Sequence, residues 1–269
     1  MLSRIVDPRA VRLSLKAPVI HPSDLSKAGS LICTKVPKNI NNIDSIFLCG
    51  GSIELALAKN NFNVKAFTHN HELFTFWACL ATDSLRLAKI IKEIQSFFED
   101  EELFYQFQET RNDSSDPFVR AAIFYALNRS SKNGIVSSGA FNDKQSRLTD
   151  LSISNIATFN FDNLIINHVE DCVDVINEYS KEFLICAPYE KFTERTQSMS
   201  PLPLELRRIN HLSLRKKLIN KDDWILIYQF SHDVMDAYSG FNYELYDYAF
   251  SKTNDSDNAK HVLIFSNNL

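Results

Sequence analysis

The chain has 269 residues, which is enough for one sizeable core or for a core with an inserted subdomain. Apolar residues make up 45% and charged residues 23%, values that are ordinary for a globular protein. The net charge of −4 argues against strong nonspecific binding to duplex DNA, because proteins of that kind usually present a basic face.

The sequence also argues against a membrane protein and against a disulfide-rich protein. The best candidate for a membrane span, Trp224–Phe230, is far too short. The N-terminal residues lack the apolar stretch of a secretory signal, so we expect a cytoplasmic protein with no membrane partner. The five cysteines are odd in number and show no CxxC spacing, which argues against a disulfide framework and a zinc site. We expect them to be buried as small apolar side chains.

The first part of the chain predicts the opening of an α/β sheet. Residues 1–44 are expected to form loops and a short helix. The apolar run Ser45–Cys49 predicts a strand that ends at the pair Gly50-Gly51, the one place where two of only six glycines meet. A helix over 54–59 and a second strand over 63–67 are expected to follow. Strand, glycine turn, helix and strand are typical of a doubly wound sheet.

The middle of the chain is predicted to be helical. Apolar residues recur at three- and four-residue spacing over 71–98, and a further helix is expected over 101–110. Asp116-Pro117 is typical of a helix start and predicts a helix over 118–128. Residues 129–144 are expected to form a polar loop.

The second half returns to short strands. We predict strands over Ile156–Phe159, Phe183–Cys186, Trp224–Tyr228 and His261–Phe265, with helices near Leu164–Tyr179 and Leu204–Ile219. Strands that alternate with helices imply a mostly parallel sheet. We therefore predict an α/β fold with a core of residues 1–80 and 150–269 and an inserted helical subdomain of residues 81–149.

Two segments carry a resemblance to a known family. Residues 105–142 resemble the form YxFR…DPxxRAAxFLYLNR…NGL…G.FN of the D12 class of N6-adenine DNA methyltransferases, the family of DNA adenine methylase. FLCGGS, beginning at Phe47, is similar to the family motif FxGxGS, and LICAPY lies where the family has a strand that ends in Asp-Pro-Pro-Tyr. The resemblance covers residues 22–269. It implies a Rossmann-like, S-adenosylmethionine-dependent methyltransferase fold whose helical insertion recognises DNA.

The resemblance also places the catalytic residues. The family flips adenine out of the duplex and holds its amino group at Asp-Pro-Pro-Tyr, where a carboxylate and a backbone carbonyl accept hydrogen bonds and the aromatic ring stacks on the base. The corresponding residues here are Cys186, Ala187, Pro188 and Tyr189. The carboxylate is missing, and a thiol is a poor acceptor.

The cofactor residues implied by the resemblance are altered as well. Phe47, Cys49 and Gly51 correspond to FxGxG, so a side chain stands where the first glycine would let the cofactor approach. Thr68 corresponds to the acid that holds the cofactor ribose, and a hydroxyl cannot replace the two oxygens of a carboxylate. Glu72 is the nearest acid, but we expect it to lie one turn into the next helix.

The DNA-reading loop implied by the family has changed in the same way. Lys132 stands where an aromatic residue would enter the duplex, Asn133 is retained, and Ser137 replaces an arginine that reads guanine. Without that arginine the chain lacks the contact that discriminates most strongly for guanine. A metal site is not expected, because the sequence places too few ligands beside His69 and His71.

These replacements favour one function and leave two alternatives. Our first hypothesis is a catalytically degenerate homologue of adenine-N6 DNA methyltransferases that acts as a non-enzymatic binding or structural module, with no cofactor and with a protein partner. The first alternative is an active adenine-N6 DNA methyltransferase that uses S-adenosylmethionine with divergent motifs. The second alternative is a protein that associates with duplex DNA without catalysis.

Overall fold

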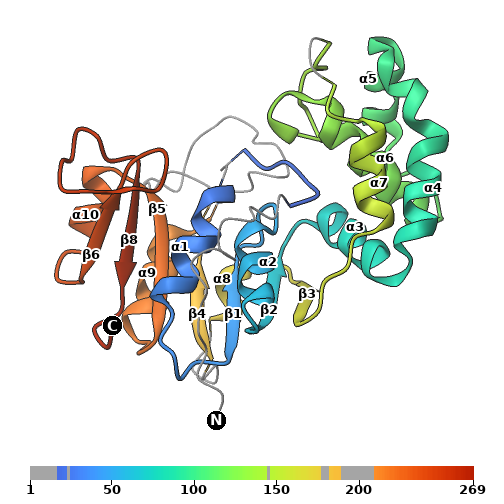
Figure 1. The fold of residues 1–269 in the computed structure, drawn as a ribbon. Helices are drawn as coiled ribbons and strands as arrows, with labels where there is room; N and C mark the ends of the chain where they lie inside the picture. The colour runs from blue at the N-terminus through green and yellow to red at the C-terminus, as the bar shows by residue number, and fades with distance from the viewer. Residues whose placement is uncertain (1–16, 23–24, 144–145, 177–181, 189–208) are drawn as a thin grey trace.

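The computed structural model describes residues 17–22, 25–143, 146–176, 182–188 and 209–269. Over these residues a sheet of eight strands forms the centre of the molecule, in the order β3-β2-β1-β4-β5-β8-β6-β7 (Figure 1). The strands are β1 (Asn42–Ile46), β2 (Asn63–Thr68), β3 (Leu164–His168), β4 (Phe183–Cys186), β5 (Trp224–Gln229), β6 (Tyr243–Tyr246), β7 (Lys252–Thr253) and β8 (His261–Phe265).

The sheet is mixed, whereas we expected a mostly parallel one. Strands β3, β2, β1, β4 and β5 pair in parallel, but β8 runs antiparallel to β5, and β6 pairs antiparallel with both β8 and β7. The sequence patterns did not predict β6 or β7. These two strands and β8 make one side of the sheet antiparallel, so the α/β content is confirmed in a sheet of mixed direction.

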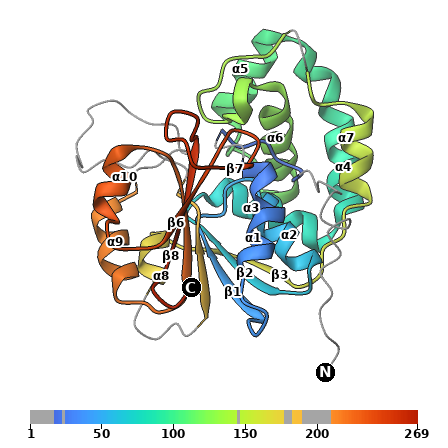
Figure 2. The same ribbon diagram turned by 60° about the vertical axis from the view of Figure 1, so that its left-hand side comes forward.

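Helices cover both faces of the sheet (Figure 2). The short 3₁₀ turn η2 (Leu25–Lys27), α1 (Ala28–Lys35) and α2 (Ser52–Lys59) lie on one face, and α8 (Cys172–Val175), α9 (His211–Ile219) and α10 (His232–Ala237) lie on the other. Alternate residues of β5 enter two separate apolar clusters: Ile225 and Ile227 pack in one, and Leu226 and Tyr228 in the other. This alternation is what a strand buried on both faces requires.

The chain between β2 and β3 forms a group of helices beside the sheet (Figure 1). Its elements are α3 (His71–Thr82), α4 (Ser84–Ile94), η3 (Gln95–Glu99), α5 (Glu101–Thr110), α6 (Pro117–Ser130), η4 (Lys132–Gly134) and α7 (Asp150–Ala157). The helix expected over 71–98 is interrupted at Asp83, whose carboxylate caps α4. The predicted helix start at Asp116-Pro117 is confirmed, with Asp116 accepting from the N–H of Phe118. Domain boundaries at residues 81 and 149 stay a prediction.

Three sequence-based elements were wrong. The strand expected over 156–159 is absent, because Thr149 and Ser152 form a capping box that starts α7, which continues to Ala157. The helix expected over 164–179 is replaced by β3 and the short α8, within the residues that are described. The first strand, expected over 45–49, is β1 (Asn42–Ile46), because Phe47 adopts a φ of 70° and ends it.

The state of the cysteines and the length of the helices are both visible in the structure. All five cysteines are buried and free, as expected. No helix within the described residues is both long and apolar enough to span a membrane.

Candidate functional site

A tight glycine turn leads from β1 into α2. Gly51 stands at the start of α2 with a φ of 88°, in the left-handed region. A Cβ atom added to Gly51 would lie 2.5 Å from Cζ2 of Trp77, which is itself 1% exposed. Both the backbone conformation and the neighbouring ring therefore require glycine at this place.

The side chain of Cys49 lies between the ends of β1 and β4. Its thiol donates to the carbonyl oxygens of Phe47, at 3.3 Å, and of Ala187, at 3.6 Å. Strand β1 pairs with β2 on one side and with β4 on the other, so the strand order reverses here, and ligands of open α/β sheets bind at such a place. A thiol is a weak donor, so the main consequence of Cys49 is that its sulfur occupies this space.

Cys186 is buried in the apolar cluster that also contains Cys49, and it is not among the described residues that line the gap beside Thr68. It is 0% exposed and packs with Cys172 and Leu214 in the apolar cluster on the α8 and α9 face of the sheet. Burial, reinforced by the neighbouring Cys172, raises the pKa of the Cys186 thiol far above its ordinary value. The residue expected in the place of the family's carboxylate is therefore a neutral side chain of the core.

The two residues after β4 are also buried. The N–H of Ala187 donates to the carbonyl oxygen of Ile46 at 3.3 Å, which extends the pairing of β4 with β1. Pro188 is buried, and Tyr189 lies outside the described residues. Ala187 thus brings its backbone to the same edge of the sheet as Cys49.

Thr68 closes the turn between β2 and α3. It is 2% exposed, and its hydroxyl oxygen accepts a 3.1 Å hydrogen bond from the N–H of Asn70. Asn70 in turn caps α3 by accepting from the N–H of Leu73 at 3.0 Å. The Thr68 hydroxyl is committed to local structure, as is usual for threonine in turns.

The space between Cys49 and Thr68 is nearly filled. A gap lined by these two residues, His69 and the segment Val19–His21 has a volume of about 20 Å³. That volume is close to what one water molecule needs.

Asn128 of α6 holds the segment that closes this gap. Its side-chain oxygen accepts from the N–H of Ile20 at 2.8 Å, and its amide nitrogen donates to the carbonyl oxygens of Ile20, at 2.9 Å, and Gly134, at 2.8 Å. Asn128 is 2% exposed. One buried amide therefore joins the N-terminal segment, α6 and the loop that follows α6.

A much larger cleft shares Cys49 and the segment Val19–His21 with this gap. Its volume is about 940 Å³, and the described residues that line it include Phe47, Cys49, Gly51, Ala187 and Asn133. Five predicted site residues thus share one cleft. Thr68, Lys132 and Ser137 are not among the described residues that line it.

The charged residues that line this cleft are mainly basic. Among the described residues they are Lys59, Arg129, Arg147 and one acid, Glu54. Burial raises the pKa of Glu54, which favours its neutral form. The Arg129 guanidinium lies 5.6 Å from the ring centroid of Tyr125, and the backbone N–H of Arg147 donates to the Arg129 carbonyl oxygen. The described wall of the cleft therefore favours anions.

The loop of residues 131–142 carries the predicted DNA-reading positions. Lys132 and Asn133 are exposed, Asn133 has a φ of 59°, and Ser137 is half-buried. The following Gly134 is fixed by its surroundings, because an added Cβ atom would lie 2.4 Å from the carbonyl oxygen of Ile20. Whether these residues contact DNA stays a prediction.

Comparison with known families supports the resemblance seen in the motifs. Residues 26–150 match the sequence model of the D12 class N6 adenine-specific DNA methyltransferase family. This part of the chain is similar to adenine-specific DNA methyltransferases of this class. The matched region contains the glycine turn, Thr68, α6 and the 131–142 loop, whereas Cys186 to Tyr189 lie beyond it. No curated protein matches the chain.

Sequence reasoning missed several polar residues around these positions. Glu54 was assigned only to a helix, although it is a buried acid on the wall of the large cleft. Asn128 and Arg129 were recognised as part of the LNR pattern but received no role. The one signal for Glu54 in the sequence was its position among apolar residues on a predicted helix. Glutamate is rarely buried this deeply, so an acid in such a position points to a special role. No group of three or more His, Cys, Asp or Glu side chains in the described ranges is placed to hold a metal ion.

Proposed function

We propose that the chain is a catalytically degenerate homologue of adenine-N6 DNA methyltransferases and acts as a non-enzymatic binding or structural module. The observation that carries the proposal is the position of Cys49, whose sulfur stands between the ends of β1 and β4, 3.6 Å from the Ala187 carbonyl oxygen. In the family that carbonyl belongs to the group of acceptors that aims the adenine amine at the methyl donor.

The residues between the glycine turn and the end of β2 do not fit the nucleoside part of S-adenosylmethionine. A nucleoside cofactor would have to reach from the glycine turn to the end of β2, but the gap between Cys49 and Thr68 measures about 20 Å³. Sites for ligands of this size usually have volumes of roughly 300–1,000 Å³. The hydroxyl of Thr68 is also engaged by Asn70, and it offers no carboxylate to a ribose.

The base-binding position supports the same proposal. Cys186 is 0% exposed within an apolar cluster, so a buried neutral thiol stands where the resemblance implies an accepting carboxylate. Losing an oriented hydrogen-bonding group of this kind costs roughly 10²–10³ in rate in enzymes that stabilise charge with it. Because the end of β2 also lacks the space and the acid for a cofactor ribose, we infer that methyl transfer has been lost.

The arrangement of strands supports a Rossmann-like methyltransferase fold. The parallel strands β3-β2-β1-β4-β5 place the glycine turn and Ala187 at the point where strand order reverses. We infer that residues 1–80 and 150–269 form the methyltransferase-like core and that residues 81–149 form the inserted helical subdomain. A retained scaffold with altered chemical positions fits a role in binding a protein partner.

Calorimetric titration with S-adenosylmethionine and S-adenosylhomocysteine tests the proposal. We expect no binding at millimolar ligand by the wild-type protein, with folding verified by circular dichroism. The double variant Cys49→Gly/Thr68→Asp is the informative comparison, because it restores the small residue and the acid. Micromolar binding by the wild-type protein, followed by methyl transfer to adenine-containing duplex DNA, would establish the active-enzyme alternative and overturn the proposal.

One observation favours a second candidate, association with duplex DNA without catalysis. Arg129 and Arg147 line the 940 Å³ cleft next to the exposed end of Asn133. Cationic side chains at phosphate contacts release counterions, so binding of this kind weakens steeply with salt. A mobility shift of duplex DNA at 50 mM salt that disappears at 200 mM and is reduced by Arg147→Gln supports this candidate. The absence of any shift at 50 mM salt rejects it.

A further inference from the structure

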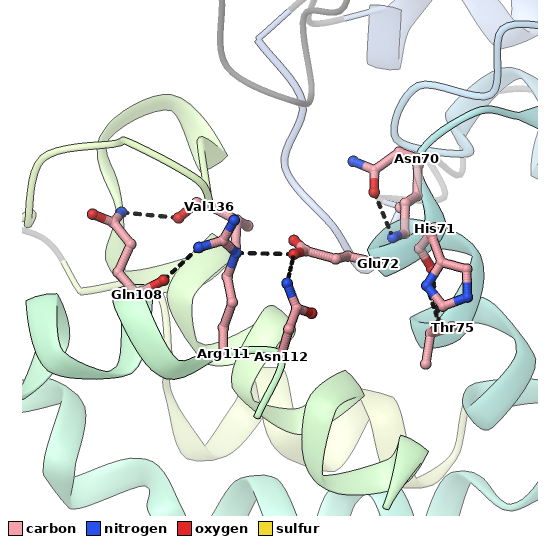
Figure 3. Close-up of polar contacts among 9 residues, drawn as sticks. Asn70, His71, Glu72, Thr75, Gln108, Arg111, Asn112 and Val136 are labelled. Carbon is pink, nitrogen blue, oxygen red and sulfur yellow. Dashed lines mark hydrogen bonds and ion pairs between the residues drawn. The ribbon is translucent and has the colours of Figure 1, made fainter. Parts of the chain in front are cut away.

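A partly buried ion pair joins the start of α3 to the residue that follows α5. Glu72 lies in the first turn of α3, and its carboxylate accepts from Nε of Arg111 at 2.9 Å and from Nδ2 of Asn112 at 2.7 Å (Figure 3). The side chains of Glu72 and Arg111 are only 12% and 17% exposed. Hydrogen bonds between charged groups that are this well shielded are stronger than those between neutral groups.

The same polar network continues to the 131–142 loop. The Arg111 guanidinium donates to the carbonyl oxygen of Gln108 at 2.5 Å. The side-chain amide of Gln108 then donates to the carbonyl oxygen of Val136 at 2.9 Å (Figure 3). It also donates to the carbonyl oxygen of Gly139 at 3.1 Å. One face of α5 thus carries both the partner of Glu72 and the donor that holds the middle of the loop.

At its other end the network begins beside Thr68. The hydroxyl oxygen of Thr68 accepts from the N–H of Asn70, and Asn70 caps the α3 helix whose second residue is Glu72. The cofactor position and the DNA-reading position of the family are therefore joined here by hydrogen bonds, one ion pair and one rigid helix turn. Such a contiguous network can transmit a change in backbone conformation from one site to the other.

The backbone geometry of the 131–142 loop makes the conformation of its middle residues dependent on Gln108. Gly139 is confined, because an added Cβ atom would lie 2.1 Å from the Ile135 carbonyl oxygen. The ends of the loop are held by backbone bonds from Asn142 to Ser130 and from Lys132 to Ala140. The Gln108 amide contacts the carbonyl groups between these anchors, so its loss acts on residues 135–140 rather than on the whole loop.

We propose that Glu72 is a positioning residue that sets the conformation of the 131–142 loop through Arg111 and Gln108. The turn after β2 and the loop then change conformation together. Whatever occupies the end of β2, or displaces the α3 N-terminus, alters how the loop presents its exposed residues Lys132 and Asn133. The inference does not depend on whether the chain retains catalysis.

Amide hydrogen exchange of the full chain, followed by mass spectrometry, tests the inference. The variants are Glu72→Ala, Gln108→Ala, the double variant, and Glu72→Gln, whose amide oxygen can still accept from both Arg111 and Asn112. Lys92→Ala is the matched control, because it removes an exposed ion pair with Asp150 in the same helical group. Thermal unfolding of each variant records the global stability alongside the local exchange.

We expect exchange over residues 135–140 to become roughly tenfold faster in Glu72→Ala and in Gln108→Ala. Exchange there should change less than about twofold in Glu72→Gln and in Lys92→Ala. In the double variant the effect should equal that of Gln108→Ala alone, because both changes break one path. Additive effects in the double variant, or an unchanged loop in Glu72→Ala with faster exchange confined to α5, would overturn the proposal.

Discussion

The hydroxyl of Ser45 on β1 donates a 2.6 Å hydrogen bond to the carboxyl group of Glu54 on α2, and both side chains are buried. Burial raises the pKa of Glu54 from the ordinary 4.5, and the Ser45 hydrogen bond only partly offsets the effect. The folded protein therefore keeps this acid neutral over a range of pH in which the unfolded chain ionises it.

The first prediction concerns stability at neutral pH. Because the folded pKa of Glu54 is raised, its contribution to stability is complete below about 4.5 and is lost as the pH rises through the folded pKa. Glu54→Gln keeps an acceptor for Ser45 and cannot ionise. We expect the variant to be more stable than the wild type at pH 8, by about 1 kcal/mol or more, and no more stable at pH 4. Urea unfolding at pH 4, 6 and 8 measures the difference in the free energy of unfolding between the variant and the wild type. A difference that is the same at all three pH values contradicts the prediction.

The second prediction has the opposite sign and concerns Glu244 on β6. Burial alone would raise the pKa of Glu244, but hydrogen bonds from Lys252, Lys35 and Tyr246 outweigh it and lower the pKa to about 2. Lys35 lies on α1, so the ion pair of 2.5 Å also fastens α1 to the antiparallel side of the sheet. A lowered folded pKa contributes stability that is present above about 4.5 and is lost as the pH falls toward 2.

Glu244→Gln should therefore lower the free energy of unfolding at pH 7 by about 1 kcal/mol, because the pair is partly screened by solvent. The deficit should shrink steadily between pH 5 and pH 2.5. Chemical unfolding of both proteins over this range checks the trend. A deficit that stays constant down to pH 2.5 would show that the side chain acts through packing rather than charge.

The third prediction compares the loss of stability when alanine replaces each of two glycines, one in a crowded and one in an open place. Gly51 and Gly240 both have positive φ, of 88° and 97°, but an added Cβ atom would meet Trp77 at Gly51 and nothing within 4 Å at Gly240. Gly240→Ala should cost about 1–2 kcal/mol from the left-handed backbone alone. Gly51→Ala should cost about 1–3 kcal/mol more, because the buried indole must shift. Denaturant midpoints compare the two directly, and equal losses would refute the role assigned to Trp77.

The fourth prediction concerns the amide that closes the small gap. Asn128→Ala removes three hydrogen bonds from a buried site and should lower stability by about 2–4 kcal/mol. Exchange of the Ile20 amide should also accelerate, because its acceptor is gone. Asn63→Ala, which removes one exposed bond to Asn42, serves as the control and should cost less than about 0.5 kcal/mol. If the two variants lose similar stability, Asn128 does not hold the 17–22 segment.

Residues close together in the sequence determined much of this fold. The run Phe183–Cys186 and the run Trp224–Tyr228 are continuous and apolar, so burial on both faces makes them strands in any α/β arrangement. Asp116-Pro117 starts α6 because a capping carboxylate and a fixed φ act within one turn. In the same way, the pair Gly50-Gly51 indicated a tight turn between strand and helix.

Other elements depended on partners far along the chain. Residues 164–168 suit a helix or a strand about equally by pattern, and β3 forms there because β2 offers it a parallel edge. The short strands β6 and β7 were missed for the same reason, since each is stabilised by pairing rather than by its own residues. These pairings turned an expected parallel sheet into a mixed one.

In the candidate site, too, some features follow from the local sequence and others from contacts between distant segments. The sequence by itself predicted, through the family resemblance, that a thiol stands in place of the family's carboxylate and another in place of its glycine. Only the tertiary structure decided that Cys186 faces the core, because that depends on the register of β4 between β1 and β5. It alone placed the Cys49 sulfur against the Ala187 carbonyl, 138 residues away in the chain. Side-chain identity is a local property, whereas contact and burial arise from packing between segments that the chain order keeps apart.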